Sequence, residues 1–220
     1  KINPAVIGLG YVGLPIFLRL NRKFKTIGFD NNKFRVEQLS NKKDFIKEFN
    51  SKDLKLKNGS FFSSRLNELK KFNFFIVTVP TPILKNNSPD LRNLINVSNF
   101  LKKIIKKNDV IFFESTVYPG VTEKVCVPII EKGSGLKNNI DFYIGYSPER
   151  INPGDKTHSI EKINKIVAIN KKKFSIASKV YKNLAKKLIF SENVREAEAS
   201  KVIENIQRDL NIGLFNEIFM

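Results

Sequence analysis

The sequence contains very little cysteine and no long apolar run. Its 220 residues include one cysteine, Cys126, so a scaffold held together by internal disulfides is excluded. No apolar run approaches the roughly 18 residues that a membrane-spanning helix needs, and no cationic segment followed by an apolar one resembles an export leader. We therefore expect a cytoplasmic protein with no membrane partner.

Acidic residues are also scarce. The chain has 39 Lys and Arg against 21 Asp and Glu, a formal net charge of +18. The lysines are interleaved with asparagine along the whole chain, which is typical of solvated faces rather than of a nucleic-acid-binding arm. Most of the 19 phenylalanines fall within apolar runs instead of standing exposed for base stacking. We expect no nucleic-acid partner, although a basic surface favours anionic nucleotides.

Hydrophobic residues make up 41% of the chain, enough for a sizeable core. Strands are expected at residues 4–7, 26–29, 74–79, 110–113, 142–146, 166–169 and 188–190, with shorter elements at 61–63 and 66–71. Helices are expected at residues 11–21, 32–38, 91–106, 121–131, 174–188 and 194–220. This alternation predicts an α/β fold, a doubly wound and mostly parallel Rossmann-like sheet. We expect one domain over residues 1–193 and the start of a connecting helix over residues 194–220.

Three spaced glycines, Gly8, Gly10 and Gly13, follow the first apolar run. In a strand-to-helix turn, the first glycine allows the tight turn, the second lets a pyrophosphate approach the backbone, and the third lets the helix pack on the strand. The anion then lies at the helix N-terminus, where backbone N–H groups are unpaired. The spacing predicts a dinucleotide site.

Asp30 closes the second strand, roughly 20 residues past the glycines, where a ribose 2′-hydroxyl would be bound. A carboxylate accepts a hydrogen bond from that hydroxyl but repels a 2′-phosphate, so NAD is favoured over NADP. The nearby cations Lys33 and Arg35 weaken this inference.

Ligands of such sheets bind beyond the carboxyl ends of the strands. The polar residues that close the apolar runs there include Asp30, Thr81, Ser115, Thr116 and Glu149. Hydroxyl and carboxylate groups suit contacts with ribose, a nicotinamide amide and a sugar. Each threonine could also simply cap the helix that follows it.

Four segments together resemble the UDP-glucose/GDP-mannose dehydrogenase family, in that family's order: residues 8–15 (GLGYVGLP), 79–82 (VPTP), 114–117 (ESTV) and 147–150 (SPER). Residues 147–158 and 196–212 are more narrowly similar to the UDP-N-acetylhexosamine 6-dehydrogenases of surface-polysaccharide synthesis. UDP-glucose enzymes usually read Pro-Glu-Phe in place of Pro-Glu-Arg. A hydroxyacid or phosphogluconate-type dehydrogenase would share the glycine turn but not these later segments.

The resemblance implies that the C6 alcohol of a UDP-sugar is oxidised to a carboxylate in two steps with two NAD, through a thioester on a cysteine. It makes Glu149 the general base, with Thr116 orienting the hydroxyl or a water. Lys201 and Asn205, four residues apart on one helix face, would stabilise the oxyanion on C6. By spacing alone these two residues would equally suit a solvated polar stripe. His158 is expected to fix its loop.

The complete set of predicted site residues follows from these arguments. The predicted cofactor-binding residues are Gly8, Gly10, Tyr11, Val12, Gly13, Asp30, Arg35, Pro80, Thr81, Ser115 and Thr116. The predicted substrate-binding residues are Glu149, Arg150, Ile151, Asn152, Lys201 and Asn205. The predicted catalytic residues are Glu149, Lys201, Asn205 and Thr116, and no metal site is expected.

Cys126 lies in an apolar helical stretch and is expected to be a small buried hydrophobe. The resemblance places the nucleophilic cysteine in a second, nucleotide-sugar domain, so we expect the chain to be a cofactor half that is inactive alone. An apolar stripe along residues 202–214 is expected to form a homodimer in the full-length protein. The alternatives are a UDP-glucose or UDP-N-acetylmannosamine dehydrogenase and a non-catalytic NAD-binding module, and the sugar configuration stays open.

Overall fold

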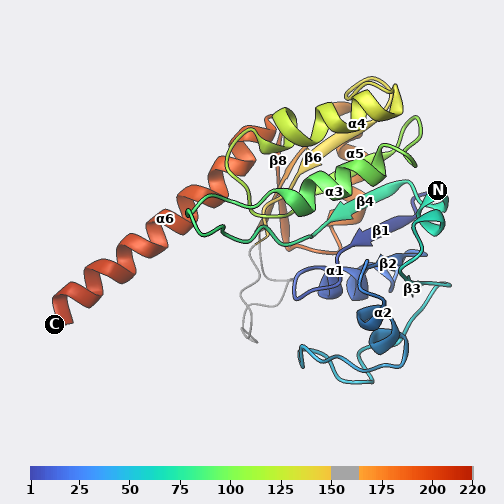
Figure 1. Ribbon diagram of the computed structural model, residues 1–220, viewed down its shortest axis with the longest axis horizontal. Coiled ribbons are helices and arrows are strands. Elements are labelled where there is room, and N and C mark those ends of the chain that lie inside the picture. The colour runs from blue at the N-terminus through green and yellow to red at the C-terminus, as the bar shows by residue number, and fades with distance from the viewer. Residues whose placement is uncertain (150–163, 220) are drawn as a thin grey trace.

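The computed structural model describes residues 1–149 and 164–219. This part of the chain forms one eight-stranded sheet in the order β3-β2-β1-β4-β5-β6-β7-β8 (Figure 1). The strands are β1 (Pro4–Ile7), β2 (Ile27–Phe29), β3 (Phe61–Ser63), β4 (Phe74–Val77), β5 (Val110–Phe113), β6 (Tyr143–Tyr146), β7 (Asn164–Ala168) and β8 (Lys187–Ser191). The helices are α1 (Gly13–Leu20), α2 (Lys33–Ser40), the 3₁₀ helix η1 (Leu66–Lys71), α3 (Arg92–Leu101), the π-helix η2 (Thr122–Cys126), α4 (Val127–Ser134), α5 (Lys171–Tyr181) and α6 (Val194–Phe219).

The central strands are short apolar runs because helices cover both faces of the sheet. Successive side chains of a strand point to opposite faces, so each strand supplies two cores. Phe75 and Val77 of β4 pack in one core with α3, α4 and the start of α6, whereas Phe74 and Ile76 pack in the other with α1, α2 and α5. The expected doubly wound α/β fold is confirmed.

One pairing departs from the parallel pattern. The strands from β3 to β6 pair in parallel, and so do β7 and β8, but β6 and β7 are antiparallel, with Tyr146 opposite Ala168. The expected "mostly parallel" sheet is therefore confirmed with this one reversal. As a result β7 begins, rather than ends, at the edge where β1, β4, β5 and β6 end.

Several predicted helix boundaries were wrong. The helix expected over residues 91–106 ends at Leu101, and turns follow it. The helix expected over residues 174–188 is α5, which starts at Lys171 because the Asn170 side chain accepts a hydrogen bond from the Lys172 N–H, and it ends at Tyr181. The helix expected over residues 121–131 begins as a π-helix and runs on to Ser134, where Gly135 ends it in a left-handed conformation.

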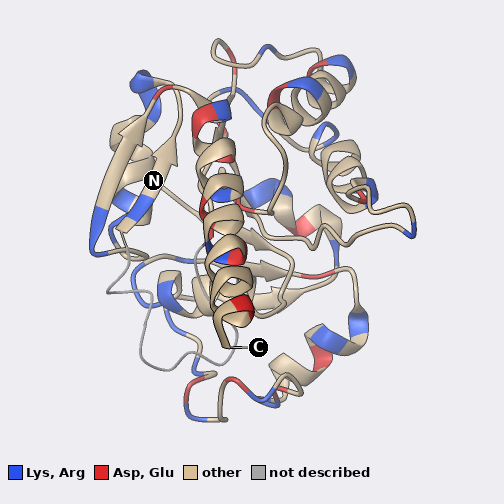
Figure 2. Cartoon of the chain, turned by 90° about the vertical axis from the view of Figure 1, so that its left-hand side faces the viewer, with Lys and Arg blue, Asp and Glu red and all other residues tan. Residues whose placement is uncertain are grey.

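Helix α6 has two different halves. Its first turns are packed on the sheet, with Val194, Ala197 and Glu198 buried. The remainder projects from the body of the molecule and exposes apolar side chains (Figure 1). Among the described helices, none is both long and apolar enough to cross a membrane. Lys and Arg are scattered over helices and loops in the view of Figure 2, and α6 carries both signs of charge.

Cys126 is buried, at 1% exposure, where η2 meets α4. Burial raises the pKa of its thiol to about 11, so the side chain stays protonated at neutral pH. The expectation that this cysteine packs as a small hydrophobe is confirmed.

Candidate functional site

A cavity of about 770 Å³ lies at the carboxyl ends of the central strands. Its lining includes most of the predicted residues, namely Gly8, Gly10, Tyr11, Val12, Asp30, Pro80, Thr81, Ser115, Thr116, Glu149 and Lys201. Three predicted residues, Gly13, Arg35 and Asn205, are not part of the lining. Arg150, Ile151, Asn152 and His158 lie outside the described residues.

The glycine loop has the geometry that its spacing predicts. Gly8 has φ of +96°, a conformation that residues with a side chain rarely adopt. A Cβ on Gly13 would lie 1.8 Å from the Gly8 carbonyl oxygen, so only glycine lets α1 pack this close. A Cβ on Gly10 would meet no atom within 4 Å, so this position borders open space.

The N-terminus of α1 is open to an anion. Its N-cap residue, Val12, makes no side-chain capping bond, and the first turn carries no acidic residue. The first N–H groups of a helix have no partner within the helix and favour an anion. In α1 the Leu14 N–H donates to the Gly10 carbonyl at 3.1 Å and Pro15 has no N–H, so the N–H groups before Leu14 are the ones that would bind an anion. The loop therefore fits the pyrophosphate of a dinucleotide, with Gly10 leaving room for its approach.

Asp30 connects the glycine loop to the end of β2. Its Oδ2 accepts a hydrogen bond from the Leu9 N–H at 2.8 Å, and its Oδ1 accepts one from the Asn32 N–H at 2.9 Å. Each carboxylate oxygen can accept more than one hydrogen bond. Asp30 can thus hold the loop and still accept from a ribose hydroxyl in the cavity that it lines.

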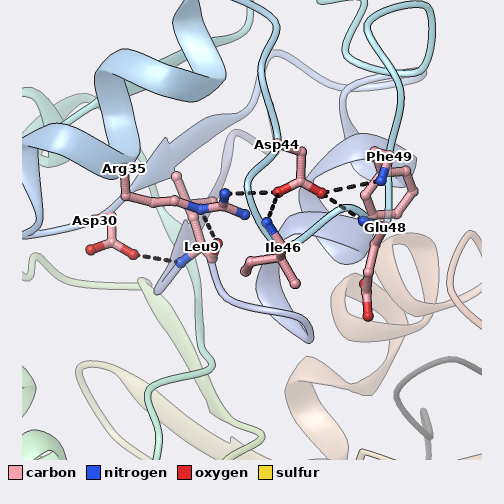
Figure 3. A network of polar contacts seen from close by, with 7 residues as sticks. All are labelled: Leu9, Asp30, Arg35, Asp44, Ile46, Glu48 and Phe49. Carbon is pink, nitrogen blue, oxygen red and sulfur yellow. Dashed lines mark hydrogen bonds and ion pairs between the residues drawn. The ribbon is translucent and has the colours of Figure 1, made fainter.

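Arg35 supports the glycine loop from outside the cavity (Figure 3). Its Nε donates to the Leu9 carbonyl at 2.9 Å, and its guanidinium pairs with Asp44 at 2.8 Å. Both side chains are buried, at 10% and 0% exposure. The Asp44 carboxylate also accepts hydrogen bonds from the backbone N–H groups of Ile46, Glu48 and Phe49. This network gives Arg35 a positioning role, and its direct contact with a cofactor stays a prediction.

The loops after β4 and β5 are tied to each other. Thr81 donates its hydroxyl to the Thr116 carbonyl at 2.6 Å, and Ser115 donates to the Val79 carbonyl at 2.6 Å. The Pro80 carbonyl accepts from the Asn93 side chain at 2.9 Å. These bonds hold the predicted hydroxyl groups at one wall of the cavity.

Glu149 belongs to a buried group of charges. The Lys165 Nζ lies 2.6 Å from Glu149 Oε2 and 2.7 Å from Glu114 Oε2, and the Tyr181 hydroxyl donates to Glu114 Oε1 at 2.7 Å. Burial raises the pKa of Glu114 to about 7. Burial lowers the pKa of Lys165, but the two carboxylates outweigh this effect and the net shift is upward. The ammonium stays charged between its two partners.

Sequence reasoning missed the roles of Lys165, Glu114 and Tyr181. The only available signal was a lysine at the start of an otherwise apolar strand, where burial of a charge requires a partner. Glu114 begins the ESTV segment, in which the predicted site residues are only the two hydroxyl residues that follow it. Tyr181 ends a helix and carries no local signal.

Helix α6 brings Lys201 to the cavity and is anchored by a fourth residue whose role was not predicted, Glu198. The Glu198 side chain is fully buried and accepts hydrogen bonds from the Gly120 and Thr122 N–H groups at 2.5 and 2.9 Å. Lys201 lies about one turn further along the helix and reaches the lining. Asn205 lies one turn beyond and is exposed, so its place in the site stays a prediction.

Comparison with known proteins places these features in context. Residues 2–185 match the family described as "UDP-glucose/GDP-mannose dehydrogenase family, NAD binding domain". The chain is 46% identical over 218 residues to Protein CapL of Staphylococcus aureus, covering 98% of this chain and 51% of that protein. It is 45% identical over 219 residues to the UDP-N-acetyl-D-glucosamine 6-dehydrogenase of Pseudomonas aeruginosa, covering 99% and 52%. The chain thus spans about half the length of these curated relatives.

The fold also matches a solved structure. A UDP-D-ManNAc dehydrogenase from Pyrococcus horikoshii superposes with a TM-score of 0.90 at 30% sequence identity. The match covers 98% of this chain and 53% of that one. The shared part extends over the sheet and into α6.

Proposed function

Because the chain belongs to the UDP-glucose/GDP-mannose dehydrogenase family, we propose that it is the cofactor-binding half of an enzyme that oxidises C6 of a UDP-N-acetylhexosamine. NAD is the cofactor of the matched domain, and the family suggested by the sequence motifs is confirmed. The observation that carries the proposal is the shared cavity, where the glycine loop and Asp30 face the same space as Glu149 and Lys201.

The residues that would hold NAD are those of the loop and of the neighbouring strand ends. The N-terminus of α1 and Gly10 would receive the pyrophosphate, and Asp30 would accept from a ribose hydroxyl. The hydroxyl-bearing loops at Thr81 and Thr116 would border the nicotinamide. When bound, NAD supplies the hydride acceptor, while the chain orients it and excludes water.

The side chains on the other wall would carry out the proton chemistry. Glu149 would accept the proton of the C6 hydroxyl as hydride leaves toward the cofactor. Lys201 would stabilise the negative charge that develops on the C6 oxygen, with Asn205 as a second donor, and Thr116 would orient the hydroxyl. The uronic acid requires a second oxidation, for which the family resemblance implies a cysteine thioester outside this chain.

The substrate is proposed from the relatives. The protein of Pseudomonas aeruginosa that is 45% identical is named for UDP-N-acetyl-D-glucosamine, whereas a relative named for UDP-N-acetyl-D-mannosamine is 32% identical. The higher identity favours UDP-N-acetylglucosamine, and the product would serve polysaccharide synthesis in the cytoplasm. A homodimer through the exposed apolar residues of α6, such as Leu210 and Leu214, completes the proposal.

Incubation of the full-length protein with NAD and UDP-N-acetylglucosamine tests the activity. We expect two NADH per sugar and a product with a C6 carboxylate by mass spectrometry, and no turnover by the 220-residue chain alone. UDP-glucose and UDP-N-acetylmannosamine serve as competing substrates, and Glu149→Gln as the inactive control. Faster oxidation of either competitor would overturn the substrate assignment, and no NADH from any UDP-sugar would overturn the function.

A further inference from the structure

A line of charged and polar groups runs from the cavity into the sheet. Glu149 and Glu114 both belong to the cavity lining, Lys165 bridges their two carboxylates from the sheet, and Tyr181 donates to the second oxygen of Glu114. The exposed fractions are 12% for the Glu149 side chain, 4% for Lys165 and 0% for Glu114. Only the Glu149 end of the line has appreciable contact with solvent.

The antiparallel pairing of β6 and β7 explains why these residues meet. Tyr146 lies opposite Ala168. Three residues further along from Tyr146 is Glu149, and three residues back from Ala168 is Lys165, so this register places the two side chains opposite each other. Directly opposed residues of neighbouring strands are close enough to form an ion pair. A parallel β7 would place Lys165 at the other edge of the sheet.

Glu114 is fixed on both of its oxygens. The Tyr181 hydroxyl donates to one oxygen and the Lys165 ammonium to the other. Glu114 follows β5, the neighbour of β6, so the anchor belongs to the rigid centre of the sheet. Lys165 is thereby held with its ammonium directed at Glu149.

Stability alone does not account for this arrangement. A buried ion pair gains little over apolar residues of the same volume, because desolvation of the charges offsets their attraction. Here one ammonium lies between two carboxylates, so the group retains an excess negative charge when all three residues are ionised. This excess negative charge lies beside the cavity, where the proposed reaction needs a proton acceptor.

We propose that Lys165 is a positioning residue that fixes the Glu149 carboxylate at the cavity wall and favours its ionised form, with Glu114 and Tyr181 anchoring Lys165. The proposal rests on the proposed function, in which Glu149 accepts the proton of the C6 hydroxyl. Within residues 1–149 and 164–219, the charged and titratable groups of this cluster are Glu149 after β6, Lys165 from β7, Glu114 after β5 and Tyr181 from α5, and Lys201 from α6 lines the same cavity.

The test compares Lys165→Met, Lys165→Arg and the matched control Lys172→Met, an exposed lysine of α5, in the full-length protein. For Lys165→Met we expect kcat to fall on the order of 10²-fold, as for a misplaced catalytic group, with little change in NAD affinity. The acid limb of the kcat profile should move to higher pH because the ammonium no longer favours the carboxylate. Lys165→Arg should restore part of the rate, and Lys172→Met should behave as wild type.

A carboxyl NMR titration of the 220-residue chain, labelled with ¹³C-glutamate, supplies a readout independent of turnover. The Glu149 signal, assigned with Glu149→Gln, should titrate at higher pH in Lys165→Met than in wild type. An unchanged titration together with an unchanged pH profile would overturn the inference. The inference would also be overturned if Lys165→Met and Lys165→Arg lost activity equally and both lost NAD binding, because that result would indicate a structural role for Lys165. If the wild-type protein oxidises no UDP-sugar, the proposed function fails and the titration alone decides the role of Lys165.

Discussion

The two walls of the cavity are built differently. On the wall formed by residues 8–13, the contacts offered to a ligand come from backbone N–H groups and from the space left by a missing side chain. On the other wall they come from the charged side chains of Glu149 after β6, Glu114 after β5 and Lys201 of α6, which Lys165 of β7 supports through its ion pairs with the two glutamates. The first wall can be read from a short motif. The second depends on contacts between segments far apart in the chain.

The largest effects on stability and on NAD affinity are expected when two glycines of the first wall are replaced by alanine. Gly13→Ala should destabilise the chain by about 3 kcal/mol or more, because the new Cβ would lie 1.8 Å from the Gly8 carbonyl oxygen. Gly10→Ala should leave stability within about 1 kcal/mol of wild type and yet weaken NAD binding at least about tenfold, because the methyl group enters the space for the phosphates. Urea unfolding and calorimetry measure the two quantities. Equal stability of the two variants would show that the wall is not formed as described.

A smaller effect on stability is expected from the Arg35–Asp44 ion pair, which supports the glycine loop from outside the cavity. Asp44→Ala should cost about 3 kcal/mol, because it leaves the Arg35 guanidinium buried without its counter-ion. Glu123→Ala removes an exposed partner of Arg195 and should cost less than about 1 kcal/mol. Urea unfolding of both variants compares the buried pair with the exposed one. A cost for Asp44→Ala no larger than that of the control would contradict a supporting role for Arg35.

The contribution of Glu114, on the second wall, to the free energy of unfolding should depend on pH. The folded pKa of Glu114, about 7, is above the ordinary value of 4.5. The folded state therefore binds this proton more tightly than the unfolded state, so the contribution to stability is full below about pH 4.5 and is lost as pH rises through about 7. Relative to Glu114→Gln, the wild-type chain should lose on the order of 2 kcal/mol between pH 5 and pH 8. If wild type and Glu114→Gln differ in stability by the same amount at pH 5 and at pH 8, Glu114 lies in a more polar environment than we describe.

The sequence predicted the backbone-built wall because its determinants are local. A strand, three glycines and an acid at the end of the next strand have a fixed spacing, and each residue has a conformational reason to be there. The alternation of strands and helices also predicted a doubly wound, mostly parallel sheet. The roles of Lys165 and Glu198 were not predicted because their partners lie 16 or more residues away in sequence: Glu149 for Lys165, and the Gly120 and Thr122 N–H groups for Glu198. The direction of β7 has no short-range signature, and it alone determines which edge Lys165 faces.

We propose that the cofactor preference of the first wall rests on Asp30. Asp30→Ala should weaken NAD binding several-fold and reduce the discrimination against NADP, because both the ribose acceptor and the repulsion of a 2′-phosphate are removed. The same change also removes the bond to the Leu9 N–H, so Asp30→Asn, which retains an acceptor oxygen, separates loop support from charge. Unchanged discrimination in both variants would place the ribose elsewhere.

Titration calorimetry of NAD and NADP into the wild-type 220-residue chain tests the central claim most directly. The account predicts one NAD bound per chain, with NAD binding more tightly than NADP and with Gly10→Ala reducing the affinity for NAD. No binding of either dinucleotide, or tighter binding of NADP, would contradict the claim that the glycine loop and Asp30 form an NAD site in this chain.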